Sequence, residues 1–365
     1  MNKRILIYDP VPYKGGSKTV AQSILSELSE PIDVWVLTNN IDNWQQNNLK
    51  KRKLLSHCFF YDKTSGLFFY LKHLMYMMSL LSLICRAGRF EKVIGISGPT
   101  VDFALYLVNL FIPLHIIQLV QGSVPNSNVA GFGLSRAMYV FYLPSALESI
   151  QRALLSYQGY CQMTGGKYSA FINGIDEKKI KKYNHSHQVE LLWAASLLKW
   201  KGLDLFIKAV DLLNLNNCSI QQKFSANICY IKPKSVAESY LLPCNLAENI
   251  KCFDDPDNLN DIRADSSIFV STSDKEPFGL SILESMVAGL VVVIPSDQAY
   301  WDQQLIDGHN CLKYEANSVD SLVVVLMSLI RDSKLRNELS INAQITAKQY
   351  SSLSCYLPIR RKIVN

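Results

Sequence analysis

Glu276-Pro277-Phe278-Gly279-Leu280-Ser281-Ile282-Leu283-Glu284 is the most informative stretch of this 365-residue chain. A short apolar run at 267–271 precedes it, and a helical pattern follows it. We therefore expect a buried strand, a turn and then a helix over 278–288, with Pro277 in the first helical turn. The first N–H groups of a helix have no partner inside the helix, and the helix dipole is positive there. This helix start is therefore a candidate phosphate site, and Gly279 would let a ligand approach the backbone.

Two glutamates lie on either side of this helix start. Glu276 precedes the turn, and Glu284 follows about two helical turns along. The stretch thus predicts a phosphate cradle with a carboxylate before it and another after it. An ordinary surface helix with two solvated glutamates is the alternative, and the rest of the chain has to distinguish the two.

Apolar runs and amphipathic segments alternate along the whole chain. In the first half, the pattern predicts strands at 4–8, 32–37, 93–96, 115–120 and 138–143. In the second half, it predicts strands at 191–194, 226–230, 268–271 and 290–294, and helices at 202–213, 319–330 and 334–350. Strands that alternate with helices favour parallel sheets covered by helices on both faces.

The length of the chain predicts two domains. A turn signal at Asn173-Gly174-Ile175-Asp176, followed by a charged run, marks the boundary. We expect an N-terminal Rossmann-like domain at 1–174 and a C-terminal one at 175–349. The last segment, from about 350 to 365, is expected to pack back on the first domain.

Composition indicates a globular protein, with 48% hydrophobic and 19% charged residues. The net charge of +6 is a mild excess that fits an anionic ligand or an acidic membrane surface without naming either. No two of the nine cysteines have metal-binding spacing, which predicts reduced thiols in a cytosolic protein. The apolar run after Arg4 is too short for a signal peptide.

The stretch from Glu276 to Glu284 resembles the signature of the retaining GT-B glycosyltransferases, the large glycosyl transferases group 1 family, of the bacterial surface-polysaccharide type. The resemblance covers most of the chain and is strongest from Asn173 to Gly308. It implies an α/β fold of two facing Rossmann-like, doubly wound domains with a central cleft. The first domain would bind the acceptor, and the second would bind a nucleotide diphosphate sugar as donor.

The resemblance also implies roles for residues of the stretch. Glu276 would lie beside the transferred sugar, and Glu284 would bind the ribose hydroxyls of the donor. The N–H groups of Phe278, Gly279 and Leu280 would hold the diphosphate and the sugar.

Two further motifs match the family. Lys201-Gly202 is similar to the family's Lys-Gly element, whose lysine contacts the diphosphate, and Gly15-Gly16 is similar to its glycine loop. Without the resemblance, the first is a surface lysine beside a capping glycine, and the second is a tight turn. The Asp307-Gly308-His309-Asn310 turn resembles a family turn that we interpret as structural.

The chain departs from the family pattern at several positions. Ser196 stands where relatives have an arginine, and Lys199 could supply the missing charge. Gln121 stands where many relatives have a histidine that hydrogen-bonds the transferred sugar; glutamine can donate and accept hydrogen bonds but cannot titrate. Lys232-Pro233-Lys234 replaces a glycine-rich turn, and Asp302 replaces a glutamate.

The candidate site residues fall into two sets. The catalytic set is Glu276, Lys201 and Gln121. The donor-binding set is Phe278, Gly279, Leu280, Glu284, Gly15, Gly16, Lys199 and Ser196. The resemblance implies a front-face displacement in which the 278–280 backbone and Lys201 stabilise the leaving diphosphate. It implies no cofactor and no metal: Asp255-Pro256-Asp257 has the spacing of a metal motif but lies in a loop of the second domain.

The expected acceptor is a growing glycan on a lipid carrier, such as an O-antigen or capsule precursor, and no nucleic acid is expected as a partner. The apolar segment at 67–85 is interpreted as one or two buried helices, or alternatively as a face that dips into a membrane. Basic clusters at 50–53 and 178–182 are either solvated or bind anionic lipid. The expected location is the cytoplasm, at the inner face of the plasma membrane.

Two rival functions remain at this point. One is a GT-B nucleotide-sugar epimerase, which needs no acceptor. The other is a non-catalytic subunit that binds a nucleotide sugar or a partner transferase. Hydrolases, zinc enzymes, P-loop ATPases and dehydrogenases rank low, because the chain lacks their nucleophile elbow, His-Glu-x-x-His helix, Walker A loop and third fingerprint glycine.

Overall fold

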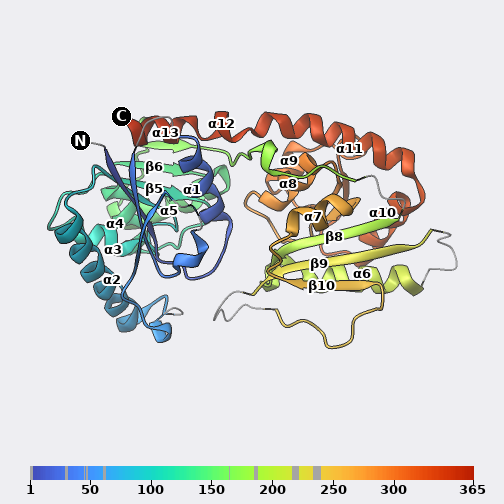
Figure 1. Cartoon of the computed structure of the whole chain (residues 1–365), viewed down its shortest axis with the longest axis horizontal. Helices are drawn as coiled ribbons and strands as arrows, with labels where there is room; N and C mark the ends of the chain where they lie inside the picture. The colour runs from blue at the N-terminus through green and yellow to red at the C-terminus, as the bar shows by residue number, and fades with distance from the viewer. Residues whose placement is uncertain are drawn as a thin grey trace. The chain divides into compact units, whose positions relative to one another are not determined.

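The computed structural model describes residues 3–28, 32–44, 46, 48–60, 63–163, 165–184, 188–215, 222–232 and 240–365. The chain divides into two compact units (Figure 1). Unit 1 contains residues 1–174 and 352–365, and unit 2 contains residues 175–351.

Unit 1 is built on a parallel sheet of seven strands in the order β3-β2-β1-β4-β5-β6-β7. Its inner strands are short, nearly continuous apolar runs, as expected for parallel strands covered on both faces. Their bounds are β1 Arg4–Asp9, β2 Asp33–Thr38, β3 Lys50–Lys53, β4 Lys92–Gly95, β5 Ile116–Val120, β6 Tyr139–Tyr142 and β7 Tyr168–Ala170.

One face of this sheet packs against helices α2 to α5, which contribute apolar side chains to a single core cluster with Leu6 and Tyr8 of β1. Because side chains alternate along a strand, Ile5 and Ile7 point to the other face. The helices of unit 1 are α1 Gly16–Ser26, α2 Gly66–Ala87, α3 Phe103–Val108, α4 Asn128–Arg136, α5 Leu147–Gln158, α12 Ser352–Cys355 and α13 Leu357–Val364.

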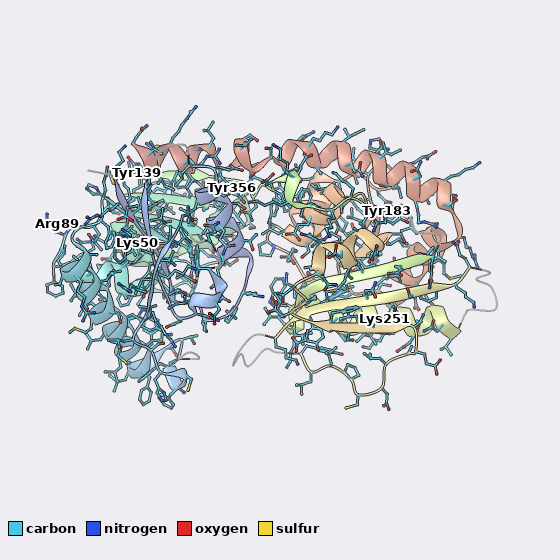
Figure 2. All side chains as sticks on the ribbon, in the orientation of Figure 1. Lys50, Arg89, Tyr139, Tyr183, Lys251 and Tyr356 are labelled. Carbon is cyan, nitrogen blue, oxygen red and sulfur yellow. The ribbon has the colours of Figure 1, made fainter. Side chains whose placement is uncertain are left out.

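The C-terminal helices belong to unit 1 through specific polar contacts. Glu27, just after α1, forms an ion pair with Arg360 of α13. The hydroxyl of Tyr356, labelled in Figure 2, lies 3.0 Å from both the N–H and the carbonyl oxygen of Gly174. The last segment of the chain therefore completes the N-terminal unit.

Unit 2 contains a parallel sheet of six strands in the order β10-β9-β8-β11-β12-β13. Its core lies between this sheet and the apolar faces of α6 and α10. The strands are β8 Val189–Ser196, β9 Phe224–Ile231, β10 Ile250–Asp254, β11 Ile268–Val270, β12 Val291–Ser296 and β13 Leu312–Glu315. The helices are α6 Leu203–Leu215, α7 Leu259–Asp265, α8 Leu280–Ala288, α9 Tyr300–Gln304, α10 Val319–Arg331 and α11 Ser333–Ala347.

The expected fold class, two Rossmann-like α/β domains with parallel sheets, is confirmed. One local expectation is wrong and another is only partly right. The helix after the Pro-Phe-Gly turn begins at Leu280 rather than Phe278, so Pro277 lies in the loop. The segment at 67–85 forms one long helix, α2, as one form of the expectation had it, but only one face of this helix is buried and the other exposes apolar side chains.

Candidate active site

The turn from β11 into α8 is shaped by Gly279. This residue is the N-cap of α8 and has a φ of +76°, a left-handed conformation that favours glycine. A Cβ at this position would lie 2.9 Å from Cγ of Glu276 and 3.0 Å from Cδ1 of Ile282. The left-handed turn explains why the helix begins after Gly279. Glycine also offers no side-chain cap, so the first amides of α8 are not covered by a capping side chain.

The turn is held from behind by aromatic side chains of unit 2. Phe278 is buried, with its ring centroid 4.9 Å from that of Tyr300 and 5.2 Å from that of Trp301. Nε1 of Trp301 donates to the carbonyl oxygen of Gly279 at 3.3 Å. The side chain of Phe278 therefore anchors the turn in the core, and any contact with a donor is left to its backbone.

Lys201 and Glu276 are brought together at this helix start. Nζ of Lys201 forms an ion pair with Oε2 of Glu276, and each side chain keeps 15% of its surface exposed. The ammonium group also lies 4.0 Å from the ring centroid of Trp200. A cation and a carboxylate that lie 75 residues apart in sequence thus meet beside the uncapped end of α8.

The backbone around Lys201 is fixed by a close contact with the loop after β11. The short 3₁₀ turn η5, Lys199–Lys201, ends at Gly202 with a φ of +68°. A Cβ on Gly202 would lie 2.1 Å from the carbonyl oxygen of Thr272. The hydroxyl of Thr272 donates to the carbonyl oxygen of Lys201 at 2.9 Å, and Nε1 of Trp193 donates to that hydroxyl at 3.0 Å.

Glu284 is held by a residue that sequence reasoning missed. Oε2 of Glu284 accepts a hydrogen bond from Nη2 of Arg263, which is almost completely buried in α7. The side chain of Glu284 remains 20% exposed. No motif in the sequence points to Arg263, because the pairing depends on how α7 packs against α8.

Ser196 and Lys199 both precede Lys201-Gly202 in the chain, but their side chains differ in exposure. Ser196 is the last residue of β8 and is partly buried, whereas Lys199 is exposed in η5. Lys232 pairs with Asp254 at 2.6 Å, while Pro233 and Lys234 lie outside the described residues. Asp302 pairs with Lys313 at 2.7 Å.

The Asp307-Gly308-His309-Asn310 turn supports its own backbone. Oδ1 of Asp307 accepts from the N–H of Lys313, and Oδ1 of Asn310 accepts from the N–H of Ile306, both at 2.7 Å. Nδ2 of Asn310 donates to Oγ1 of Thr346 in α11 at 3.0 Å. These bonds give the turn a structural role.

Gly15, Gly16 and Gln121 belong to unit 1 and are described within it. Gly15 is the N-cap of α1 in an extended conformation, and a Cβ there would meet no atom within 4 Å. Gly16 is the first residue of α1. Packing therefore gives no reason for a glycine at position 15, where a side chain would fill open space in front of the helix.

Gln121 directly follows β5. Its Nε2 is buried and has no hydrogen-bond partner within the part of the chain that the structure describes. An unpaired buried donor is costly, so this amide is ready to bind an acceptor atom of a ligand.

The same end of the unit 1 sheet holds a buried ion pair. Asp9, the last residue of β1, accepts from Nζ of Lys18 at 2.8 Å and from Nε1 of Trp44 at 2.8 Å. Burial lowers the pKa of Lys18, and the charge and hydrogen bond of Asp9 oppose this shift. The pair ties α1 to β1 directly behind the glycine loop.

Residues 175–346 match the family model described as glycosyl transferases group 1. This stretch lies within unit 2, which is therefore similar to the glycosyl transferases group 1 family. The matched region contains Lys201, Glu276, Gly279 and Glu284. A comparison with curated proteins gives no match.

Solved structures of glycosyl transferases resemble the whole chain. HepE from Anabaena, solved with UDP and glucose, has 13% sequence identity and a TM-score of 0.73, with 100% of each chain covered. WaaG, a glycosyltransferase involved in lipopolysaccharide biosynthesis, has 15% identity and a TM-score of 0.68, with 99% of each chain covered.

Sucrose-phosphate synthase from Thermosynechococcus elongatus has 12% identity and a TM-score of 0.71, with 100% of this chain and 98% of that chain covered. At these identities the likeness concerns the fold, which is GT-B. The chain therefore has a second unit that is similar to the group 1 family, and its fold resembles GT-B structures over its full length.

Among the described residues, no group of three or more His, Cys, Asp or Glu side chains is placed to hold a metal ion. The charged groups that gather at α8 are instead Lys201, Glu276, Arg263 and Glu284.

Proposed function

We propose that this chain is a retaining glycosyltransferase that moves a sugar from a nucleotide diphosphate sugar to a glycan acceptor. One observation carries the proposal: the ion pair of Lys201 and Glu276 lies beside the uncapped N-terminus of α8. The lysine, the first amides of α8 and the helix dipole all favour a diphosphate. The carboxylate of Glu276 offers acceptors for sugar hydroxyls.

The chemistry follows from this charge distribution. Negative charge develops on the diphosphate as the bond to the sugar breaks, and Lys201 with the amides of α8 would stabilise it. The leaving phosphate would accept the proton of the acceptor hydroxyl, which attacks from the same face and so retains the configuration. Glu276 would position the sugar and would not form a covalent bond with it. No metal or other cofactor is part of this proposal.

Unit 1 would supply the remaining groups. The unpaired Nε2 of Gln121 is proposed to donate a hydrogen bond to the transferred sugar. The glycine loop, with open space at Gly15, is proposed to admit the donor phosphate or the acceptor. Lys199, exposed beside Lys201, is proposed to replace the positive charge that is absent at Ser196.

The proposed acceptor is a lipid-linked precursor of a surface polysaccharide. This chain shares its fold with WaaG, a glycosyltransferase involved in lipopolysaccharide biosynthesis. This likeness supports the class of acceptor by analogy. Such an acceptor would require unit 1 to work at the cytoplasmic face of the plasma membrane.

Helix α2 supports a membrane contact. It is the one helix among the described residues with the length and apolar composition to cross a bilayer. Of its most apolar stretch of 18 residues, 39% is buried in unit 1. Its other face exposes Leu67, Phe68, Tyr70, Leu71, Leu74 and Met78. Figure 1 shows α2 at the surface of unit 1. An apolar face on a helix anchored by its opposite face suits an interfacial position.

Cations lie beside this apolar face. Nζ of Lys63 lies 4.9 Å from the ring centroid of the exposed Phe59, which in turn lies 5.5 Å from the ring of Phe68. By contrast, the basic cluster at 178–182 is engaged within unit 2, where Lys181 pairs with Asp261 and Lys182 donates to the carbonyl oxygen of Val287. The proposed lipid contact is therefore limited to unit 1.

A thermal-shift panel tests the donor site. UDP, GDP, ADP and CMP, each with its common sugar conjugates, are added to the wild type and to Glu284→Ala. We expect one diphosphate to raise the melting temperature and the variant to weaken its binding by about 1–3 kcal/mol. The absence of a shift with every nucleotide would contradict the proposal.

Turnover separates the proposal from its rivals. Glu276→Ala should abolish most sugar transfer while nucleotide affinity is largely kept. Ser196 and Gln121, which replace charged or titratable groups of relatives, favour a non-catalytic binding subunit as the second candidate. That candidate predicts nucleotide binding without any turnover in the wild type, and an epimerase predicts turnover without an acceptor.

Vesicle flotation tests the membrane contact. The wild type should float with phosphatidylglycerol-containing vesicles at low salt, and Leu71→Glu should reduce the floating fraction at least about threefold, because a charge in the apolar face opposes insertion. Val324→Glu, at an exposed valine of α10, is the matched control. Failure of the wild type to float would remove the membrane part of the proposal.

A further inference from the structure

Arg263 is a charged side chain in a place where a charge needs compensation. It is 1% exposed, lies in α7, and its Nε has no hydrogen-bond partner among the described residues. Burying a guanidinium group is unfavourable unless its hydrogen bonds and its charge are matched. The two terminal nitrogens of the guanidinium group have partners: Nη1 hydrogen-bonds Asn260, and Nη2 hydrogen-bonds Glu284 of α8, whose carboxylate also matches the charge.

The acceptor groups around Arg263 are themselves held in place. Nη1 of Arg263 donates to Oδ1 of Asn260 at 2.6 Å, and Nη2 donates to Oε2 of Glu284. Nδ2 of Asn260 donates to the carbonyl oxygen of Lys179 at 3.1 Å. Asn260 and Arg263 are three residues apart, so they share one face of α7. The guanidinium fork is therefore fixed at one end before it reaches Glu284.

This arrangement acts on one oxygen of Glu284 and leaves the other for a ligand. The side chain of Glu284 is 20% exposed, and its hydrogen bond with Arg263 is made through Oε2. A free glutamate on a helix surface samples several rotamers, and ordering it on binding weakens affinity. A planar guanidinium group restricts the carboxylate more than a flexible ammonium group does.

We infer that Arg263 is a positioning residue that holds Glu284 ready to accept the ribose hydroxyls of the donor, and that it thereby determines the preference for a ribonucleotide over its 2′-deoxy form. The inference rests on the proposed function, which places the ribose at Glu284. Arg263 acts through Glu284 and does not touch the nucleotide.

The test compares two ligands on the full chain. Dissociation constants are measured by calorimetry for UDP, or for the diphosphate that the nucleotide panel selects, and for its 2′-deoxy analogue. The wild type should prefer the ribonucleotide by at least about tenfold, the effect of a hydrogen bond to a charged group. Arg263→Lys and Glu284→Gln should each bring the ratio below about threefold, and the double variant should match Glu284→Gln alone.

A matched variant separates positioning from stability. Arg360 is also a buried arginine paired with a glutamate, but it lies in unit 1. Arg360→Lys should lower the melting temperature about as much as Arg263→Lys does and leave the ribo-to-deoxy ratio at the wild-type value. Asn260→Ala, which keeps the ion pair and removes its anchor, should lower the ratio by about twofold or more, and it serves if Arg263→Lys does not fold.

The outcomes distinguish this inference from the proposed function. If Glu284→Gln loses the preference while Arg263→Lys and Asn260→Ala keep it, the positioning role is wrong and the ribose assignment stands. If Glu284→Gln itself keeps the preference, the ribose assignment in the proposed function is wrong, and the inference is overturned with it.

Discussion

Gly202 places Lys201 against the loop after β11, and the conformation of this glycine can be tested directly. Gly202 and Gly308 have nearly the same left-handed φ, +68° and +71°, but a Cβ would meet the carbonyl oxygen of Thr272 at 2.1 Å only at Gly202. Gly308→Ala should cost about 1–2 kcal/mol of unfolding free energy for the backbone alone. Gly202→Ala should cost clearly more and should also weaken nucleotide binding. Urea unfolding of both variants checks this, and equal losses would contradict the role of the close contact.

Asp102 makes the stability of unit 1 depend on pH, and the variant Asp102→Asn can isolate this effect. Burial raises the pKa of this carboxyl group to about 8, against hydrogen bonds from Gln118 and the N–H of Ser97. Between the unfolded pKa near 3.8 and this value, the folded state binds more protons, so stability falls as pH rises. Asp102→Asn should remove this fall, about 1.4 kcal/mol per pH unit, between pH 5 and pH 8. Parallel stability profiles for the two proteins would contradict the assignment.

Which site residues the sequence can reveal depends on whether their neighbours are local. Glu276, Gly279 and Glu284 share one turn and helix, and their spacing predicts the candidate site. Arg263 comes from another helix, and its partner is set by packing alone. The prediction that Pro277 lies in the first helical turn is wrong for a local reason. A proline suits that turn, but Gly279 is in a left-handed conformation and the helix begins only after it.

At the scale of elements, all four strands that the sequence pattern does not predict lie at sheet edges. They are β3 and β7 in unit 1 and β10 and β13 in unit 2. Inner parallel strands are covered on both faces and read as apolar runs, whereas edge strands need not be. β3 is the extreme case, with the sequence Lys-Lys-Arg-Lys. Charged edge strands of this kind discourage pairing with other chains.

Helix α2 shows the opposite limitation. Most of its residues are apolar on both faces, so composition does not distinguish the face that packs on the sheet from the face that remains exposed. The buried face includes Phe69, His73, Tyr76 and Leu80. The structure separates the two faces because only one of them meets α3 and the core of unit 1.

His73 makes the docking of α2 sensitive to acid. Its ring is fully buried among Phe69, Tyr76 and Phe103, and both ring nitrogens lack a partner among the described residues. Burial, with a contribution from Lys72, lowers the pKa of His73 from 6.5 to about 3. Between these values the unfolded state binds more protons, so stability falls as pH falls.

The variant His73→Phe should remove this loss. Relative to its own value at pH 7.5, the variant should retain about 2 kcal/mol more unfolding free energy at pH 5 than the wild type does. Comparing the two pH profiles cancels any constant packing effect of the larger ring. Urea unfolding at both pH values provides the measurement, and identical slopes would show that His73 is not the group responsible.

At the scale of the whole molecule, unit 1 is assembled from two separate parts of the chain. Tyr356, Ile359 and Ile363 of its C-terminal part are buried, and Arg360 pairs with Glu27. Deletion of residues 352–365 should therefore expose apolar surface of unit 1 and leave Glu27 without its cation. We expect this truncation to destabilise unit 1 while unit 2 stays folded. Hydrogen exchange should show protection lost in β1 and α1 and kept in β8 and β12.

Because unit 2 is inserted between the two parts of unit 1, the order of synthesis on the ribosome has a consequence for folding. Every residue of unit 2 is translated before α13, whose Arg360 completes the pair with Glu27. The surface of unit 1 that receives α13 therefore stays uncovered while the whole of unit 2 is synthesised and folds. Chaperones that recognise apolar segments should accordingly bind the nascent N-terminal half and be released only after α13 has been synthesised.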